Sequence, residues 1–188
     1  MTSAFYSSQE LRRLGIHSVG KNVLVSRKAS LYGKENISIG DNSRIDDFCI
    51  LSGKIEIGRY VHIAAFCALY GAKGIVIKEF SGLSAKSIIY SASDDFSGEF
   101  MIGATVPQEF TNVTGGTVVL EKYVQVGAGC IIMPNVTLEE GVSVGAMSLV
   151  TKSLPSWTIN IGIPARFYKR RSMNLLELAK TLRTSECN

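Results

Sequence analysis

Aliphatic residues recur at every sixth position along much of this chain. Counting onward from Leu120, each sixth residue is aliphatic: Val126, Ile132, Leu138, Val144 and Val150. An amphipathic helix would place its apolar residues about 3.6 positions apart, and a half-buried strand would place them about 2 apart. A period of six instead predicts a solenoid in which each hexapeptide forms one short flat side of a coil.

The same spacing runs through the first half of the chain. We refer to these aliphatic positions as rungs, and the earlier ones are Val19, Val25, Leu31, Ile37, Ile39, Ile45, Leu51, Ile57, Ile63, Leu69, Leu83 and Ile89. The register slips by two residues after Leu31-Tyr-Gly and after Leu69-Tyr-Gly, which predicts a widened corner at both places. Three hexapeptides per coil predict a triangular prism whose interior is filled by stacked rungs, so that each coil needs a neighbour to bury its core.

A second set of residues shares the predicted interior. Four positions after most rungs the chain has a small residue or valine: Ala29, Ser43, Cys49, Val61, Cys67, Ser81, Ser87, Cys130, Val136, Val142 and Ser148. Cys49, Cys67 and Cys130 are therefore predicted to be structural filler, because a buried cysteine behaves as a small hydrophobic residue. Cys187 lies in the tail and carries no prediction.

The fold class predicted is mainly β, one parallel β-helix domain over residues 1–188 with a helix at each end. Residues 5–15 form a short helix, with a capping box at Ser7-Ser-Gln-Glu10 and a stop at Gly15. The β-helix covers residues 19–89 and 118–151, and residues 90–116 interrupt it as an aperiodic loop of the kind that is usually functional. Residues 157–171 connect to an amphipathic helix at 172–184, which caps the open end or packs on a neighbouring subunit.

Composition places the chain among ordinary folded domains. Hydrophobic residues make up 46% and charged residues 19% of its 188 residues. The N-terminus lacks a basic segment followed by an apolar one, and no stretch approaches the roughly 18 apolar residues of a membrane helix. We therefore expect a cytoplasmic protein without membrane insertion.

The net charge of +4 is unevenly placed, because four basic residues gather between Arg166 and Arg171. Three interpretations compete for this cluster: nucleic-acid binding, a phosphate-bearing small ligand, and a merely solvated face. Nucleic-acid binding is disfavoured because no base-stacking aromatic residues are interleaved with the charges and the repeats match no nucleic-acid module. A phosphate-bearing ligand remains the better partner.

The hexapeptide repeats, the interrupting loop and the ending Trp157…Gly162-Ile-Pro-Ala-Arg166 together resemble the acetyltransferases of the maltose, galactoside and xenobiotic group. The segments at Ile45–Cys49, Tyr60–Ala64, Tyr90–Glu99 and Val106–Val113 are most similar to those of dTDP-4-amino-4,6-dideoxyglucose (viosamine) acyltransferases. The resemblance implies a left-handed β-helix, a homotrimer with active sites between subunits, and acetyl transfer from acetyl-CoA to a nucleotide-linked amino sugar of O-antigen biosynthesis.

The resemblance also assigns residues to each substrate. Acetyl-CoA would lie on Ala128, Gly145, Ala146, Gly162, Pro164, Ala165, Arg166, Lys169 and Arg170, with the basic residues on its phosphates. The glycines have an equal structural explanation, since a coil corner requires them for its backbone geometry. The sugar would bind to Tyr90, Ser93, Asp94, Asp95 and Glu99, where a carboxylate is better suited to hold an ammonium group than to deprotonate it.

The catalytic base is where the chain departs from the group. Related enzymes carry a histidine in the segment corresponding to residues 90–99, and this chain has none there. Only His17 and His62 exist, and His17 precedes the first rung as a surface or capping residue. His62 follows a rung by five and faces outward, so it is either the base or a structural or interface histidine.

Other functions were weighed against this one. O-acetylation of a saccharide is the alternative reaction, and a non-catalytic scaffold is the alternative class. The γ-type carbonic anhydrases share this kind of helix but need three histidines on zinc, which two histidines in one chain do not supply, and no metal-type CxxC spacing is present. We therefore expect no metal.

Overall fold

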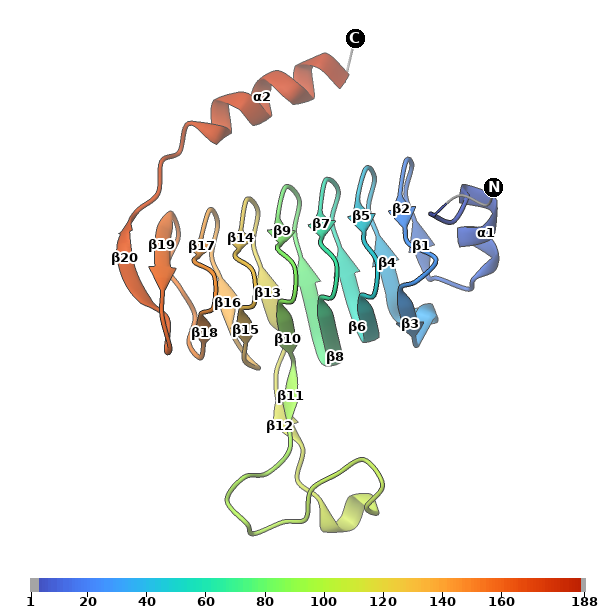
Figure 1. Cartoon of the computed structure of the whole chain (residues 1–188), viewed down its shortest axis with the longest axis vertical. Helices are drawn as coiled ribbons and strands as arrows, with labels where there is room; N and C mark the ends of the chain where they lie inside the picture. Colours follow the sequence, from blue (N-terminus) through green and yellow to red (C-terminus); the bar gives the residue numbers. More distant parts are fainter. Residues whose placement is uncertain (1–3, 187–188) are drawn as a thin grey trace.

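The computed structural model describes residues 4–186, which wind into a parallel β-helix of about seven coils (Figure 1). Each coil runs through three flat faces joined by three corners. Figure 1 shows the coils stacked side by side in sequence order, with one loop and one helix standing out from the prism on opposite sides.

The first face carries short parallel strands that stack coil upon coil. These are β1 (Ser18–Val19), β4 (Ile37–Ile39), β13 (Val118–Leu120), β16 (Thr137–Leu138), and the second halves of β6 (Ile50–Ile57) and β8 (Ala68–Ile77). The first halves of β6 and β8 belong to the third face, together with β3 (Ser30–Tyr32), β10 (Ile88–Tyr90), β15 (Ile131–Ile132) and β18 (Leu149–Val150).

The second face is a sheet of its own. It contains β2 (Leu24–Val25), β5 (Arg44–Ile45), β7 (His62–Ile63), β9 (Gly82–Leu83), β14 (Gln125–Val126), β17 (Ser143–Val144) and β19 (Thr158–Ile161), all parallel, with β20 (Arg166–Arg170) antiparallel to β19 at its edge. The corner between the first and second faces is the first corner, that between the second and third is the second corner, and that between the third and first is the third corner.

The rungs form the core. From Ile37 to Val150 they are all buried, and they make one continuous cluster. The small residues four positions after the rungs include Cys49, Cys67 and Cys130, which are fully buried. Their thiols donate to the carbonyl groups of Ala64, Ser84 and Gly145, at 3.2, 3.2 and 3.1 Å respectively. The structure thus agrees with the prediction of stacked rungs beside small residues.

The two register slips lie at the third corner, where the chain is longer. β6 and β8 continue through this corner, and the first coil forms a short 3₁₀ helix, η1 (Lys34–Asn36), there. Gly53 has φ +88°, and a Cβ on it would lie 2.7 Å from the carbonyl oxygen of Gly71. Only glycine permits the neighbouring coil to come so close.

Stacked aromatic rings line the first corner. Tyr60 stacks on Phe80 at 5.0 Å between ring centroids, Phe80 on Tyr123 at 5.5 Å, and Tyr123 contacts Trp157 at 6.3 Å. Such offset pairs stabilise successive coils beyond their buried area.

The β-helix extends further than the sequence predicted, because one more strand follows residue 151. In β19 the inward residues are Thr158 and Asn160, each 1% exposed, and the Asn160 amide donates to the Thr158 hydroxyl at 2.8 Å. A polar pair in the inward positions breaks the aliphatic period, so the expected connecting segment at 157–171 is instead the β19–β20 hairpin.

The terminal helices also differ from expectation. α1 (Ser8–Arg13) is shorter than 5–15, although its capping box at Ser7 and Glu10 is present. α2 (Leu175–Glu186) does not cover the open end of the prism but lies along the first corner of its own chain (Figure 1). Arg183 of α2 pairs with Glu79 at 3.0 Å, and Glu79 also binds Arg59 and Lys122.

Among residues 4–186, no helix is both long and apolar enough to cross a membrane.

Candidate active site

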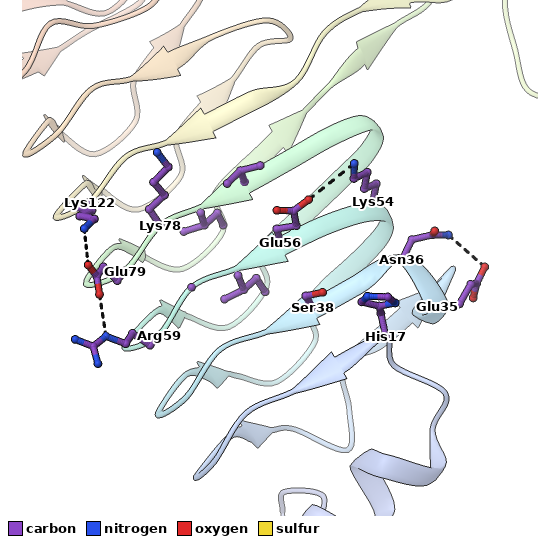
Figure 2. Close-up of a pocket in the computed structure, with 14 residues that line it drawn as sticks. His17, Glu35, Asn36, Ser38, Lys54, Glu56, Arg59, Lys78, Glu79 and Lys122 are labelled. Atoms are coloured by element: carbon purple, nitrogen blue, oxygen red, sulfur yellow. Dashed lines mark hydrogen bonds and ion pairs between the residues drawn. The ribbon is translucent and has the colours of Figure 1, made fainter. Parts of the chain in front are cut away.

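A wide groove lies on the first face, and its chemistry is that of a solvated surface. It is a groove of about 680 Å³ whose charged side chains include Lys54, Glu56, Arg59, Lys78 and Glu79 (Figure 2). These groups pair with their neighbours, as in Lys54–Glu56 at 3.9 Å and Arg59–Glu79 at 2.8 Å. His17 lies on its rim, away from any carboxylate partner in the described part of the chain.

A second hollow, on the second face, has the features of a site. This notch of about 380 Å³ is lined by Tyr60, His62, Ala64, Phe80, Ser81, Gly82, Leu83, Ser84, Ala85 and Gln125. It exists because small residues interrupt two columns of outward side chains: Gly82 lies between His62 and Gln125, and Ala64 lies between Asp46 and Ser84. The missing side chains leave room for a ligand beside an imidazole and a hydroxyl.

His62 is held in this notch by a carboxylate from the coil before. Its Nε2 lies 2.8 Å from Oδ2 of Asp46, whose Oδ1 accepts from Nε of Arg44 at 2.6 Å. The His62 side chain is 56% exposed, whereas that of Asp46 is 17% exposed. His62 is therefore an oriented histidine that is open to a ligand, as a base requires.

Ser84 is a site residue that sequence reasoning missed. Its hydroxyl lies at the second corner, where it accepts from the Gln125 amide at 3.3 Å. Sequence reasoning missed Asp46 as well. The coil length of 18 residues could have found it, because this length places Arg44 beside His62 on the neighbouring strand and so brings Asp46 close to His62.

From Ser84 a strip of small residues runs along the second corner toward the C-terminal coils. The small-residue strip consists of Ala64, Ala65, Ser84, Ala85, Gly127, Ala128, Gly145 and Ala146, stacked by inter-coil hydrogen bonds such as Gly127 N–H to Val144 at 2.8 Å. A Cβ on Gly127 would lie 2.5 Å from the Ala146 nitrogen, so backbone packing alone requires that glycine. Ala128 and Ala146 are exposed, so backbone packing does not require small side chains there. Small side chains at these two positions leave room for a ligand on the surface.

The Gly162–Arg166 turn closes the far end of this strip. The Gly162 amide donates to the Ser148 hydroxyl at 3.0 Å, and Pro164 is exposed. Ala165 is buried, with its amide donating to the Leu149 carbonyl at 2.8 Å, so only its backbone could face a cofactor.

The residues of the basic cluster have two kinds of surroundings. Arg171 turns inward and donates to the carbonyl oxygens of Tyr123 and Gly141 at 2.7 and 3.0 Å, and partial burial lowers its pKa below the usual value. Arg166, Lys169 and Arg170 of β20 are exposed, and none of them pairs with a carboxylate within residues 4–186. Three exposed cations on one strand, without a carboxylate partner within residues 4–186, are suited to phosphates.

The loop at residues 90–116 projects from the third corner on a two-stranded stem (Figure 1). β11 (Ala92–Ser93) and β12 (Thr114–Gly115) form the stem, and a 3₁₀ helix, η2 (Gln108–Phe110), lies beyond it. Tyr90 stacks on Tyr70 at 5.3 Å at the base. Phe96, 87% exposed, is among several uncovered apolar side chains of the loop.

The two loop carboxylates, expected to act alike, differ in the structure. Asp95 accepts from the Ser97 hydroxyl at 2.8 Å and from the amides of Gly98 and Phe100, and the Ser97 hydrogen bond foremost lowers the pKa of Asp95. Its carboxylate is thus occupied by the loop itself. Asp94 is partly exposed with its carboxylate unpartnered within residues 4–186, while the Ser93 hydroxyl donates to the Asp94 carbonyl at 3.1 Å and Glu99 is exposed.

Ser84 and Asp94 do not meet within one chain. Ser84 lies at the second corner and Asp94 beyond the third, so the full width of β10 on the third face separates them. Within the described residues, no group of three or more His, Cys, Asp or Glu side chains surrounds a metal-sized space.

Comparisons with known proteins agree with this geometry. Residues 36–71 match the family described as bacterial transferase hexapeptide (six repeats). The chain is 42% identical to the dTDP-4-amino-4,6-dideoxy-D-glucose acyltransferase of Escherichia coli, over 97% of this chain and 96% of that protein. It is 25% identical, over 90% of this chain and 83% of the relative, to WbbJ of Escherichia coli K12, described as a lipopolysaccharide biosynthesis O-acetyl transferase.

Among solved structures, AntD is an N-acyltransferase from Bacillus cereus crystallised with dTDP and 3-hydroxybutyryl-CoA. It superposes with a TM-score of 0.96 at 50% identity, covering 100% of both chains. AntD has also been solved as S84A with dTDP-4-amino-4,6-dideoxyglucose and coenzyme A, and as D94A with dTDP and coenzyme A. This chain has Ser84 and Asp94 at the same numbers.

Fold and site together define a hexapeptide-repeat acyltransferase, with the left-handed parallel β-helix that the resemblance implied. Within that class, the chain belongs to the family of dTDP-4-amino-4,6-dideoxy-D-glucose acyltransferases.

Filling the notch tests whether it is the site. A Cβ on Gly82 would lie 3.1 Å from the end of the Gln125 side chain, which is free to move, so we expect Gly82→Val to fold with an unchanged unfolding midpoint. Displacing the substrate should lower kcat/KM by about 100-fold. Ser38→Val in the first-face groove is the matched control and should retain activity; the opposite pattern would place the site in that groove.

Proposed function

We propose that this protein transfers an acetyl group from acetyl-CoA to the amine of a dTDP-4-amino-4,6-dideoxyhexose. The amine nitrogen attacks the thioester carbonyl, the carbon–sulfur bond breaks, and the amine proton passes to a base as coenzyme A leaves with a free thiol. The observation that carries this proposal is the notch where the His62 imidazole and the Ser84 hydroxyl meet at one end of the small-residue strip. Membership of the family supports the choice of sugar.

The cofactor lies along the small-residue strip in this proposal. Within residues 4–186, the backbone amides of Ala128 and Ala146 make no hydrogen bond and are available to the amide groups of a pantetheine arm. The amide and carbonyl of Gly145 are occupied by Asn160 and Ser148, so Gly145 contributes by lacking a side chain. Gly162 and Pro164 form the turn beyond it, and Arg166, Lys169 and Arg170 bind the phosphates by charge-assisted hydrogen bonds. The thioester then reaches the notch from the C-terminal side.

Three copies assemble through the third face. The outward column of that face is apolar over five coils, Ile50, Ala68, Ile88, Ile131 and Leu149, in register from strand to strand. The equivalent column of the first face contains Ser18, Ser38 and Glu56. An apolar column on one face alone supports a subunit interface there.

This assembly brings the two halves of the site together. When three prisms point their third faces at a common axis, the second corner of each copy adjoins the third corner of the next. The loop of one copy thereby reaches the notch of its neighbour, so Asp94 meets Ser84 only across the interface. Tyr90, Ser93 and Glu99 accompany Asp94 as sugar contacts, whereas Asp95 holds the loop.

Each polar group has one role in this proposal. Asp94 binds the sugar amine, because an ionised carboxylate holds the ammonium form well and is a weak base for it. The ammonium loses one proton to water before the attack, and the neutral amine that results is the nucleophile. His62 takes the proton from the amine, because it is the imidazole that the notch exposes to a ligand and that Asp46 orients. The product is a precursor for O-antigen polysaccharide, made in the cytoplasm where nucleotide sugars and acetyl-CoA are available.

Thiol release tests the reaction directly. The purified protein is mixed with acetyl-CoA or 3-hydroxybutyryl-CoA and with a panel of dTDP-4-amino sugars, dTDP-3-amino sugars, galactosides and maltose. We expect turnover with acetyl-CoA and a dTDP-4-amino sugar. Turnover with a saccharide hydroxyl alone would instead identify an O-acetyltransferase, and failure to bind coenzyme A would indicate a scaffold.

A charge on the third face should break the assembly. Ile131 is 37% exposed in the single chain, so Ile131→Asp should leave the coil folded and weaken association by about thirtyfold or more, with a parallel loss of activity. Light scattering measures the mass, and circular dichroism checks the fold. Val76→Asp on the first face is the control; a fully active Ile131→Asp trimer would contradict the proposed interface.

Steady-state kinetics should distinguish the role of His62 from that of Asp94. His62→Ala should lower kcat by about 100-fold or more with little change in KM, because a general base acts in the transition state. Asp94→Asn should mainly raise KM for the amino sugar. If His62→Ala keeps wild-type turnover across about pH 6 to 9, His62 is not the base.

A further inference from the structure

The side chains that hold His62 also determine which of its nitrogens is free. Asp46 reaches Nε2 of His62 with Oδ2 and receives Nε of Arg44 on Oδ1, so the three groups form a chain of two hydrogen bonds at 2.8 and 2.6 Å. Arg44 is itself held against the ring of Phe5, with 5.1 Å from its guanidinium carbon to the ring centroid. The carboxylate therefore has a set position between the other two groups.

Asp46 is ionised in this arrangement. Partial burial by itself would raise the pKa of Asp46, but the hydrogen bonds and charges of His62 and Arg44 together outweigh burial and hold that pKa below its usual value. An ionised carboxylate only accepts hydrogen bonds, so Nε2 of His62 must carry the proton. In the neutral imidazole the lone pair is then on Nδ1.

The surroundings leave that nitrogen accessible. The charged or titratable groups around the ring are Arg44 and Asp46 from the preceding coil and Tyr60 from the first corner. The following coil contributes Gly82 and the coil after it contributes Gln125; neither brings a charge, and Gly82 brings no side chain. The notch thus opens beside the imidazole on the side away from Asp46.

We propose that Asp46 is a positioning residue that fixes the tautomer and orientation of His62, so that Nδ1 is the atom that accepts the proton from the sugar amine. As the amine nitrogen bonds to the thioester carbon, one of its protons moves to Nδ1, and the imidazolium formed is stabilised by the adjacent carboxylate. The imidazolium then gives that proton to the sulfur as the carbon–sulfur bond breaks, which releases coenzyme A as the thiol. The catalytic part rests on the proposed function of His62; the tautomer does not.

The chain is well suited to a direct measurement, because it has only two histidines. Proton–nitrogen correlation spectra of the nitrogen-15-labelled full chain, compared with His17→Gln, assign the His62 signals. We expect neutral His62 to be protonated on Nε2. Asp46→Asn removes the charge but keeps the shape, and because an amide can both donate and accept, the fraction of neutral His62 protonated on Nδ1 should rise.

Kinetics supply the second readout. In Asp46→Asn, kcat should fall at least about tenfold while KM for acetyl-CoA stays unchanged, because a positioning residue acts on the transition state and not on cofactor binding. The matched control is Asp47→Asn, because the Asp47 carboxylate binds Ser26 and Lys28 instead of His62. That variant should retain both the Nε2-protonated tautomer of His62 and the activity.

Three results would overturn the proposal. Neutral His62 protonated on Nδ1 contradicts the proposed tautomer, and unchanged tautomer populations in a folded Asp46→Asn contradict the role of Asp46 in fixing them. The Nε2-protonated tautomer together with a fully active His62→Ala contradicts the proposed base and hence the role of Asp46 in catalysis. Circular dichroism of each variant separates these results from loss of fold.

Discussion

Every coil in this protein depends on the coil before it and the coil after it. A coil of about 18 residues has no core of its own, because its rungs become buried only when they stack on equivalent rungs, and its backbone groups are satisfied only by the neighbouring coils. Gly20, Gly40 and Gly58 show the ladder, each amide donating to a rung carbonyl of the following coil at 2.7–2.8 Å. In-register stacking is thus the constraint on which all other features rest.

The same register places surface residues in columns, and the columns differentiate the three faces. The second face brings Arg44 and His62 onto neighbouring strands, and it opens a notch where the next member of the column is Gly82. The third face presents apolar residues such as Ile88 and Ile131 in one line. The three faces therefore differ in their outward residues, whereas their inward residues are buried and mostly aliphatic.

Where the period is interrupted, local hydrogen bonds decide what each group is free to do. The carboxylate of Asp95 accepts hydrogen bonds from the Ser97 hydroxyl and from amides of its own loop, whereas that of Asp94 has no partner within residues 4–186. The guanidinium of Arg171 donates to carbonyl groups of the first corner, whereas Arg166 and Arg170 are exposed at the surface. Neighbouring residues of one type thus divide between architecture and binding.

The six-residue period by itself determined the β-helix, its inward residues and the position of its interruption, because the burial of one residue per hexapeptide is written directly in the spacing. Resemblance then supplied the hand and the chemistry. The six-residue period missed the last coil, because its inward residues are Thr158 and Asn160. These two polar residues are hydrogen-bonded to one another, and a search for aliphatic residues does not detect them. Only the tertiary structure decided that Asp46 holds His62, that Ser84 shares the notch and that Asp94 lies on a different corner. These relations depend on side-chain direction and on neighbours 16 or more residues away, which a linear period does not encode.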